Sequence, residues 1–155
     1  MTEISKAVLS ALSGHTLATA ESCTGGAIGA ALTAIPGASA VYKGGIVSYC
    51  NEIKRDLLGV PAAMLEAFGA VSAPVAEAMA VGARTALNTD AAVSVTGLAG
   101  PDADEFGNPV GTVFIGYADA RHSLSRHFLF AGDREAVRTQ AVEAALQLVL
   151  EEFHG

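Results

Sequence analysis

A serine, a cysteine and a threonine stand side by side in the segment Ala-Glu-Ser-Cys-Thr-Gly-Gly, residues 20–26. A strand-like run over 16–20 precedes the segment, and apolar residues recur with helical spacing from Thr24 onward, which predicts a strand-to-helix junction. The unpaired backbone N–H groups at the start of a helix favour an anion or a developing oxyanion. Ser22 is therefore a candidate nucleophile. The alternative is that Ser22 or Thr24 only caps the helix.

The thiol of Cys23 is a second candidate nucleophile, since a helix N-terminus lowers the pKa of a cysteine. No histidine lies near it in a recognisable pattern, which favours Ser22 over Cys23. The four histidines have no metal-ligand spacing, and the acidic stretch 102–105 is expected to be solvated. The sequence therefore predicts neither a metal site nor a cofactor.

A phenol and an amine are five residues apart in Tyr-Cys-Asn-Glu-Ile-Lys, from Tyr49 to Lys54. A neutral lysine can take the proton of a serine when burial or a neighbouring cation lowers its pKa, and a tyrosine hydroxyl can relay that proton. The chain has only three lysines, so a lysine beside a motif is more informative than in a lysine-rich protein. The alternative is a solvated Lys54 and a Tyr49 that only packs.

A glycine-rich loop and two arginines are candidates for binding an anion. The loop 96–102, Thr-Gly-Leu-Ala-Gly-Pro-Asp, presents backbone N–H groups after an apolar run, although it lacks the P-loop lysine and the Rossmann spacing. Arg134 and Arg138 are one helical turn apart at the start of the last predicted helix, which suits a phosphate or a carboxylate. An exposed, ion-paired helix face is the alternative for the two arginines.

The elements that must position these residues follow from hydrophobic periodicity. Strands are expected over 16–20, 44–49, 91–96, 110–118 and 122–130, and helices over 4–12, 24–35, from 51, 61–68, 72–87 and 133–153. This order predicts a three-layer α/β/α sandwich with a mixed, mostly parallel sheet of about five strands, the last two forming an antiparallel hairpin. Ligands of such sheets bind outside the carboxyl ends of the parallel strands. The loops after Ala20, Tyr49 and Thr96 should therefore meet at one edge.

Composition limits the classes of function. A chain of 155 residues, 51% hydrophobic, fits one domain over 1–155, and no apolar run approaches the roughly 20 residues of a membrane span. The net charge of −7 and the lack of a basic cluster argue against binding to long nucleic acids. With no secretory signal, a cytoplasmic location and free thiols at Cys23 and Cys50 are expected. The alanine-rich helix faces are compatible with a homodimer.

Six segments in this order resemble one known family, the CinA C-terminal domain family of nicotinamide-nucleotide amidases. They are Thr-Ala-Glu-Ser-Cys-Thr-Gly-Gly, Gly-Gly-Ile-Val-Ser-Tyr-Cys-Asn-Glu-Ile-Lys, Gly-Ala-Val-Ser, Val-Ser-Val-Thr-Gly-Leu-Ala-Gly-Pro-Asp, Pro-Val-Gly-Thr-Val and Phe-Ala-Gly-Asp-Arg-Glu-Ala-Val-Arg. The resemblance covers about residues 4–153. Six ordered motifs are far more specific than any one of them.

The resemblance implies hydrolysis of nicotinamide mononucleotide to nicotinic acid mononucleotide and ammonia, with a small nucleotide as the partner. It implies Ser22 as the nucleophile, Lys54 as its base and Tyr49 as a bridge between them, with backbone N–H groups after Ser22 holding the oxyanion. The substrate-binding residues implied are Cys23, Thr24, Gly25, Thr96, Gly97, Gly100 and Arg138. Of these, Thr24, Thr96, Gly97, Gly100 and Arg138 are the candidates for the ribose phosphate.

Two departures from the family pattern leave alternatives open. Cys50 stands where the family usually has serine, and residues 102–108 replace the usual Asp-Gly-Gly stretch. The resemblance is to the C-terminal domain alone, so functions of the larger N-terminal domain of two-domain CinA proteins are not expected from it. A nucleotide-binding or regulatory module without turnover, and an amidase for another small amide, are the alternative hypotheses.

Overall fold

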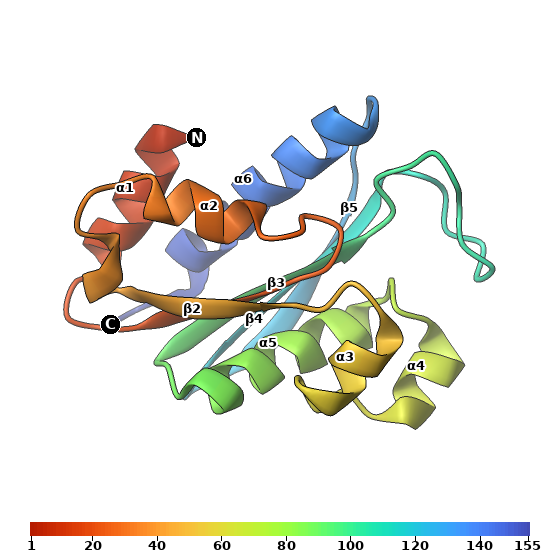
Figure 1. The fold of residues 1–155 in the computed structure, drawn as a ribbon, viewed down its shortest axis with the longest axis horizontal. Helices are drawn as coiled ribbons and strands as arrows, with labels where there is room; N and C mark the ends of the chain where they lie inside the picture. Colours follow the sequence, from red (N-terminus) through yellow and green to blue (C-terminus); the bar gives the residue numbers. More distant parts are fainter.

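A computed structural model describes all residues, 1–155, and its elements follow the expected order (Figure 1). Along the chain they are α1 (Thr2–Ala11), β1 (Leu17–Glu21), α2 (Ala27–Thr33), the 3₁₀ turn η1 (Ala38–Ala40), β2 (Tyr42–Val47), α3 (Asn51–Asp56), α4 (Ala62–Phe68), α5 (Ala73–Leu87), β3 (Ala91–Gly97), β4 (Thr112–Asp119), β5 (Ser123–Leu129) and α6 (Arg134–Glu152). The sequence-based boundaries agree to within a few residues. No helix combines the length and the apolar character needed to cross a membrane.

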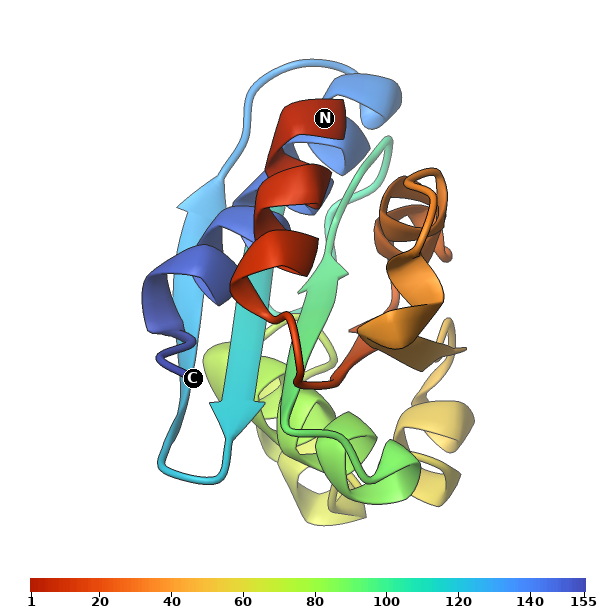
Figure 2. The same cartoon turned by 90° about the vertical axis from the view of Figure 1, so that its left-hand side faces the viewer.

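The five strands form one mixed sheet in the order β2-β1-β3-β4-β5. β1 pairs in parallel with β2 and β3, whereas β4 is antiparallel to both β3 and β5. A short turn joins β4 to β5, as Figure 2 shows, so the predicted hairpin and the mixed sheet are confirmed. All strands except β4 therefore run in the same direction, and the carboxyl ends of β1, β2 and β3 meet at one edge.

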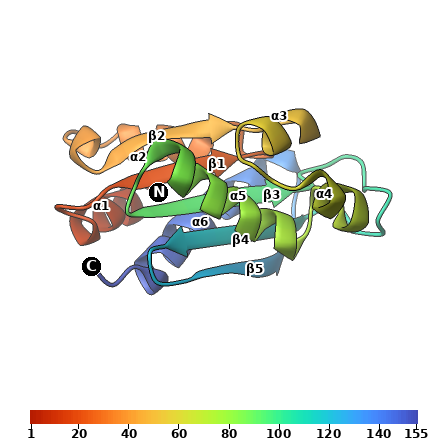
Figure 3. The ribbon, with the colours of Figure 1, turned by 90° about the horizontal axis from the view of Figure 1, so that it is seen from below.

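Helices cover both faces of the sheet. Seen from below in Figure 3, α5 crosses the strands on one face, with α3 and α4 beside it, while α1, α2 and α6 cover the other face. The α5 side is packed with small residues, including Ala18, Ala20 and Ala92 against Met79, and the α6 side has a larger aliphatic core. Both faces of β1 and β3 are thus buried, as is typical of strands between two layers of helices.

The helix after the first motif starts later than its periodicity suggested. α2 begins at Ala27 rather than at Thr24, because Gly25 and Gly26 have φ values of +59° and +107°, which interrupt a right-handed helix. The residues from Ser22 to Gly26 therefore form a separate turn between β1 and α2. This turn, rather than the helix, carries the candidate nucleophile.

Candidate active site

A pocket of about 410 Å³ lies at the carboxyl ends of β1, β2 and β3. Of the ten sequence-predicted site residues, seven line it: Ser22, Cys23, Tyr49, Lys54, Thr96, Gly97 and Gly100. Three strand ends and the start of α6 contribute to its wall, so residues more than 100 positions apart in the chain meet here. The expectation that the loops after the first three strands share one edge is confirmed.

The amine of Lys54 contacts Ser22 at the centre of this pocket. Its Nζ donates to Ser22 Oγ at 3.1 Å and to the backbone oxygen of Ser48 at 2.6 Å. Lys54 is only 2% exposed, and none of the ion pairs of the chain includes it. Burial lowers the pKa of Lys54, because a desolvated amine is disfavoured in its charged form. Such an amine can accept the proton of a serine hydroxyl.

The short helix α3 directs Lys54 inward. Lys54 is the only buried residue of α3, while Glu52, Arg55 and Asp56 on the same helix are turned away from the core. Its backbone is held at both ends, since Lys54 N donates to Cys50 O at 3.2 Å and Val60 N donates to Lys54 O at 3.0 Å. A surface lysine, the alternative weighed from sequence, is therefore wrong for this residue.

A buried carboxylate that the sequence analysis did not identify organises the turn that bears Ser22. Glu21 is 2% exposed, and its two oxygens accept hydrogen bonds from Thr24 Oγ1 at 2.7 Å, Ile28 N at 2.8 Å and Gly29 N at 3.0 Å. The first N–H groups of α2 are thus already paired with an anion from the protein itself. The expectation that the helix terminus would receive a substrate oxyanion is wrong. An acidic residue closing an otherwise apolar strand was the available signal.

Backbone donors directly after Ser22 remain free in the same turn. Ser22 N donates to Val95 O and Gly25 N donates to Ser22 O, whereas the N–H groups of Cys23 and Thr24, between them, have no partner within the chain. They immediately follow the serine, and the N–H of the residue after a nucleophilic serine is an oxyanion donor in one class of serine hydrolases. The turn, not the helix, therefore offers the oxyanion donors.

The thiol of Cys23 lines the pocket but is a poor nucleophile. Its side chain is buried, and this burial raises its pKa to about 11, despite the opposing charges of Arg138 and Lys54. The thiolate, which is the reactive form, is therefore scarce at neutral pH. Cys50 is exposed and free, and the chain has no disulfide.

Tyr49 lies at the mouth of the pocket rather than between Ser22 and Lys54. Its ring is 63% exposed, and its hydroxyl accepts a hydrogen bond from Arg134 Nη2 at 3.1 Å. The same guanidinium donates through Nη1 to Gly100 O. Tyr49 makes no hydrogen bond with Ser22 or Lys54 in this structure. Arg134, one of the two arginines suggested as anion ligands, forms part of the wall and pairs with no carboxylate.

Arg138 and the turn residues Thr24 and Gly25 lie outside the pocket wall. The guanidinium of Arg138 donates to the backbone oxygens of Cys23 and Thr24, each at 3.0 Å. Thr24 is fully buried with its hydroxyl on Glu21, so these side chains hold the shape of the turn. Of the two arginines, Arg134 rather than Arg138 reaches the pocket, because the first residue of α6 lies closest to the sheet edge.

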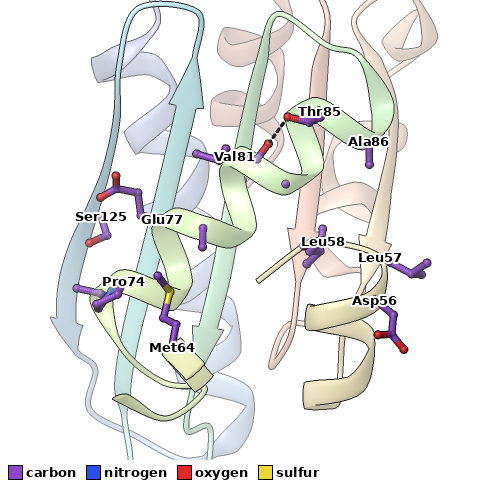
Figure 4. Close-up of a pocket in the computed structure, with 14 residues that line it drawn as sticks. Asp56, Leu57, Leu58, Met64, Pro74, Glu77, Val81, Thr85, Ala86 and Ser125 are labelled. Atoms are coloured by element: carbon purple, nitrogen blue, oxygen red, sulfur yellow. Dashed lines mark hydrogen bonds between the residues drawn. The ribbon is translucent and has the colours of Figure 1, made fainter. Parts of the chain in front are cut away.

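A larger cavity, about 780 Å³, lies on the outer face of α5 (Figure 4). Its wall is mostly aliphatic, with Leu58, Met64 and Val81, and the hydroxyl of Thr85 is used within the helix, donating to Val81 O at 3.0 Å. No serine or cysteine there is in contact with a base. The cavity at the strand ends is therefore the better candidate for chemistry, although it is smaller.

Comparison with known proteins identifies the family of the chain. The sequence model of the CinA C-terminal domain matches residues 1–153. The chain is 47% identical to the nicotinamide-nucleotide amidohydrolase PncC of Escherichia coli K12 over 141 residues, which cover 90% of this chain and 86% of that protein. It is 50% identical to a CinA-like protein of Geobacter sulfurreducens over 133 residues, 86% of this chain but only 32% of that protein. The chain thus spans about a third of the length of such CinA-like relatives.

Solved structures show the same fold. The competence damage-inducible protein A of Klebsiella pneumoniae superposes with a TM-score of 0.95 at 38% identity, covering 97% of this chain and 95% of that one. The competence/damage inducible protein CihA of Agrobacterium tumefaciens gives a TM-score of 0.93 at 38% identity, covering 97% and 93% of the two chains. The α/β architecture is therefore shared over essentially the whole chain.

Proposed function

Because the chain belongs to the CinA C-terminal domain family, we propose that it hydrolyses the carboxamide of nicotinamide mononucleotide, giving nicotinic acid mononucleotide and ammonia. The observation that carries this proposal is the contact between Ser22 Oγ and the buried amine of Lys54 at 3.1 Å. The name of the Escherichia coli relative, nicotinamide-nucleotide amidohydrolase, supports the choice of substrate. The proposal concerns this domain and not the longer CinA-like proteins.

Lys54 is the base that activates Ser22. In its neutral form the amine accepts the Ser22 proton while one N–H remains on the oxygen of Ser48, which keeps the lone pair directed at the hydroxyl. Desolvation lowers the pKa of Lys54, so the neutral form is accessible nearer to neutral pH than for a solvated lysine. The charge that forms on Lys54 is temporary, because the proton is passed on in the next step.

The reaction proceeds through an acyl enzyme. Ser22 Oγ attacks the carboxamide carbon, and the N–H groups of Cys23 and Thr24 stabilise the resulting oxyanion. The C–N bond breaks as the nitrogen takes the proton from Lys54, and ammonia leaves. Water then attacks the ester carbon and gives a proton to Lys54, which returns it to Ser22 as the acid departs. One water is consumed for each ammonia released.

The phosphate of the substrate is placed at the mouth of the pocket, on Arg134. Its guanidinium contacts only neutral acceptors in this structure, Gly100 O and the Tyr49 hydroxyl, so its charge is available to a phosphate. Thr96 was a candidate for binding the ribose phosphate, but its hydroxyl is buried and donates to Ala70 O at 2.7 Å. The role of Tyr49 as a bridge to Ser22 stays a prediction, which requires its hydroxyl to leave Arg134.

A coupled ammonia assay with nicotinamide mononucleotide, nicotinamide and NAD side by side tests the proposal. We expect ammonia from the mononucleotide, with little from nicotinamide because it lacks the phosphate that Arg134 holds. Ser22→Ala should abolish release without loss of the fold. Tight binding of the mononucleotide without ammonia would instead indicate a nucleotide-binding module, and preference for another amide would indicate a different amidase.

A further inference from the structure

Three consecutive backbone oxygens beside the reaction pocket each accept a hydrogen bond from a side chain. Gly69 O accepts from Ser72 Oγ at 2.8 Å, Ala70 O from Thr96 Oγ1 at 2.7 Å, and Val71 O from Asn108 Nδ2 at 3.2 Å. The side chains of Ala70 and Val71 belong to the pocket lining that also contains Ser22 and Lys54. We call residues 69–71 the pinned wall.

One of these three side chains, Asn108, belongs to the excursion 102–108, the part of the chain that departs from the family pattern. Asp104 shapes this excursion: its Oδ1 accepts from Phe106 N at 3.1 Å and Asn108 N at 3.0 Å, and its Oδ2 accepts from Asn108 Nδ2 at 2.8 Å. The amide of Asn108 thus bridges Asp104 and Val71. The ring of Phe106 covers Gly69, where an added Cβ would come within 2.6 Å of it.

Ala70 and Val71 of the pinned wall line both the reaction pocket and a second cavity of about 680 Å³, which Gly69 also lines. Asn51, Ala70, Val71 and Leu98 line both spaces, and Asp104 and Phe106 line the second cavity only. Movement of residues 69–71 therefore changes the volume of the space in front of Ser22. The apolar side chains of this wall are a suitable surface for an aromatic ring whose carboxamide must reach Ser22.

We propose that Asn108 is a positioning residue, which fixes the pinned wall through Val71 O so that the pyridine ring of the mononucleotide is held against it. This inference rests on the proposed function for the identity of the ligand. Asn108 itself lines neither pocket and contacts neither Ser22 nor Lys54, so it acts on the substrate only through the wall. Its loss should therefore weaken substrate binding and leave the chemical step nearly intact.

The first test measures kcat and KM of ammonia release for Asn108→Ala. We expect KM to rise roughly three- to ten-fold, as for the loss of one hydrogen bond, with kcat within about two-fold of the wild type. Ser123→Ala is the matched control, because it removes a comparable bond between elements, Ser123 Oγ to Glu77 Oε2 at 2.7 Å, away from the pocket. An unchanged KM in Asn108→Ala, or the same change in Ser123→Ala, would overturn the proposal.

A reciprocal exchange separates the wall contact from the internal order of the excursion. In the double variant D104N/N108D an amide at 104 can again donate to a carboxylate at 108, while no group at 108 can donate to Val71 O. We expect its KM to stay raised, as in Asn108→Ala. A return to the wild-type KM would show that the order of the excursion, and not the bond to the wall, is responsible.

A binding measurement distinguishes failure of this inference from failure of the proposed function. Calorimetric titration of nicotinamide mononucleotide into Ser22→Ala, with and without Asn108→Ala, needs no turnover. A weaker Kd in the double variant supports the role of Asn108 even if the wild type releases no ammonia. Turnover by the wild type with an equal Kd in both variants would refute the inference alone, and no binding by either variant would refute both.

Discussion

At the carboxyl ends of β1, β2 and β3, the amine of Lys54 is buried without an ion pair, whereas around the β4–β5 turn every buried or half-buried charge has a partner. There His122 lies between Asp119 and Glu152, with Nδ1 3.3 Å and Nε2 2.9 Å from their oxygens. Arg126 adds contacts to Glu151 at 2.9 Å and to Glu152 at 3.2 Å. Carboxylates thus contact the basic side chains at one end of the sheet, whereas Lys54 and Arg134 at the other end contact only neutral acceptors.

This difference indicates which of the charged side chains is suited to act as a base. A paired, partly solvated charge contributes only modestly to stability. A desolvated amine with only a hydroxyl and a carbonyl as partners is costly in its charged form, which makes it a base. Glu21 is the intermediate case, because its carboxyl group is buried but accepts hydrogen bonds from three donors.

The strongest test of the comparison is Lys54→Met, which removes the amine and keeps an apolar side chain of similar length. We expect ammonia release to fall about 10²–10⁴-fold, the usual range for loss of a general base. The free energy of unfolding at neutral pH should not fall by more than about 1 kcal/mol, since the lost bond to Ser48 O is offset by removal of a desolvated amine. Chemical denaturation measures this, and a large loss of stability would show that Lys54 is a structural residue.

The pH dependence of activity and stability should follow the lowered pKa of Lys54. Only the neutral amine accepts the Ser22 proton, so kcat/KM should rise as pH increases toward this pKa and level off above it. Between the lowered pKa and 10.5, the ordinary value, the unfolded chain binds more protons than the native one, so this residue makes stability increase with pH. Both trends should be absent from Lys54→Met. An activity that falls as pH rises through this range would contradict the assignment.

Glu21→Ala tests the buried carboxylate that has partners. We expect it to lower the free energy of unfolding by about 2–4 kcal/mol, because Ile28 N and Gly29 N lose their acceptor in a buried position. Ammonia release should fall as well, since the Ser22 turn loses its anchor. Glu143→Ala, at an exposed position on α6, is the control and should change stability by less than about 0.5 kcal/mol. Equal thermal midpoints for the two variants would contradict a stabilising role for Glu21.

The smallest effect is expected at the opposite end of the sheet. Glu152→Gln weakens the contacts to His122 and Arg126, both about 40% exposed, and should cost about 1 kcal/mol or less. The loss should shrink further in high salt, which screens exposed pairs. Steady-state kinetics should be unchanged. A change in kcat would show that the two ends of the sheet are coupled.

Local sequence pattern was sufficient for the elements and for the edge at which they meet. The alternation of apolar runs and turns predicted the order of helices and strands, and Asp133, where the last helix was expected to begin, caps α6 by accepting from Ala136 N at 2.9 Å. Ser22 and Lys54 were selected as a pair from motifs, and the structure places them in contact. These features depend on neighbours in sequence or on ordered motifs, which a sequence displays directly.

Only the tertiary structure decided which side chains enter the pocket. Arg134 reaches Tyr49 and Gly100, while Arg138 turns to the back of the Ser22 turn, a choice set by how α6 docks on the sheet. The carboxyl group of Glu21 accepts hydrogen bonds from Ile28 N and Gly29 N at the start of α2, where a substrate anion was expected from the sequence. The sequence by itself determined the groups and their order, whereas burial and side-chain direction, which arise from contacts between distant segments, determined their chemistry.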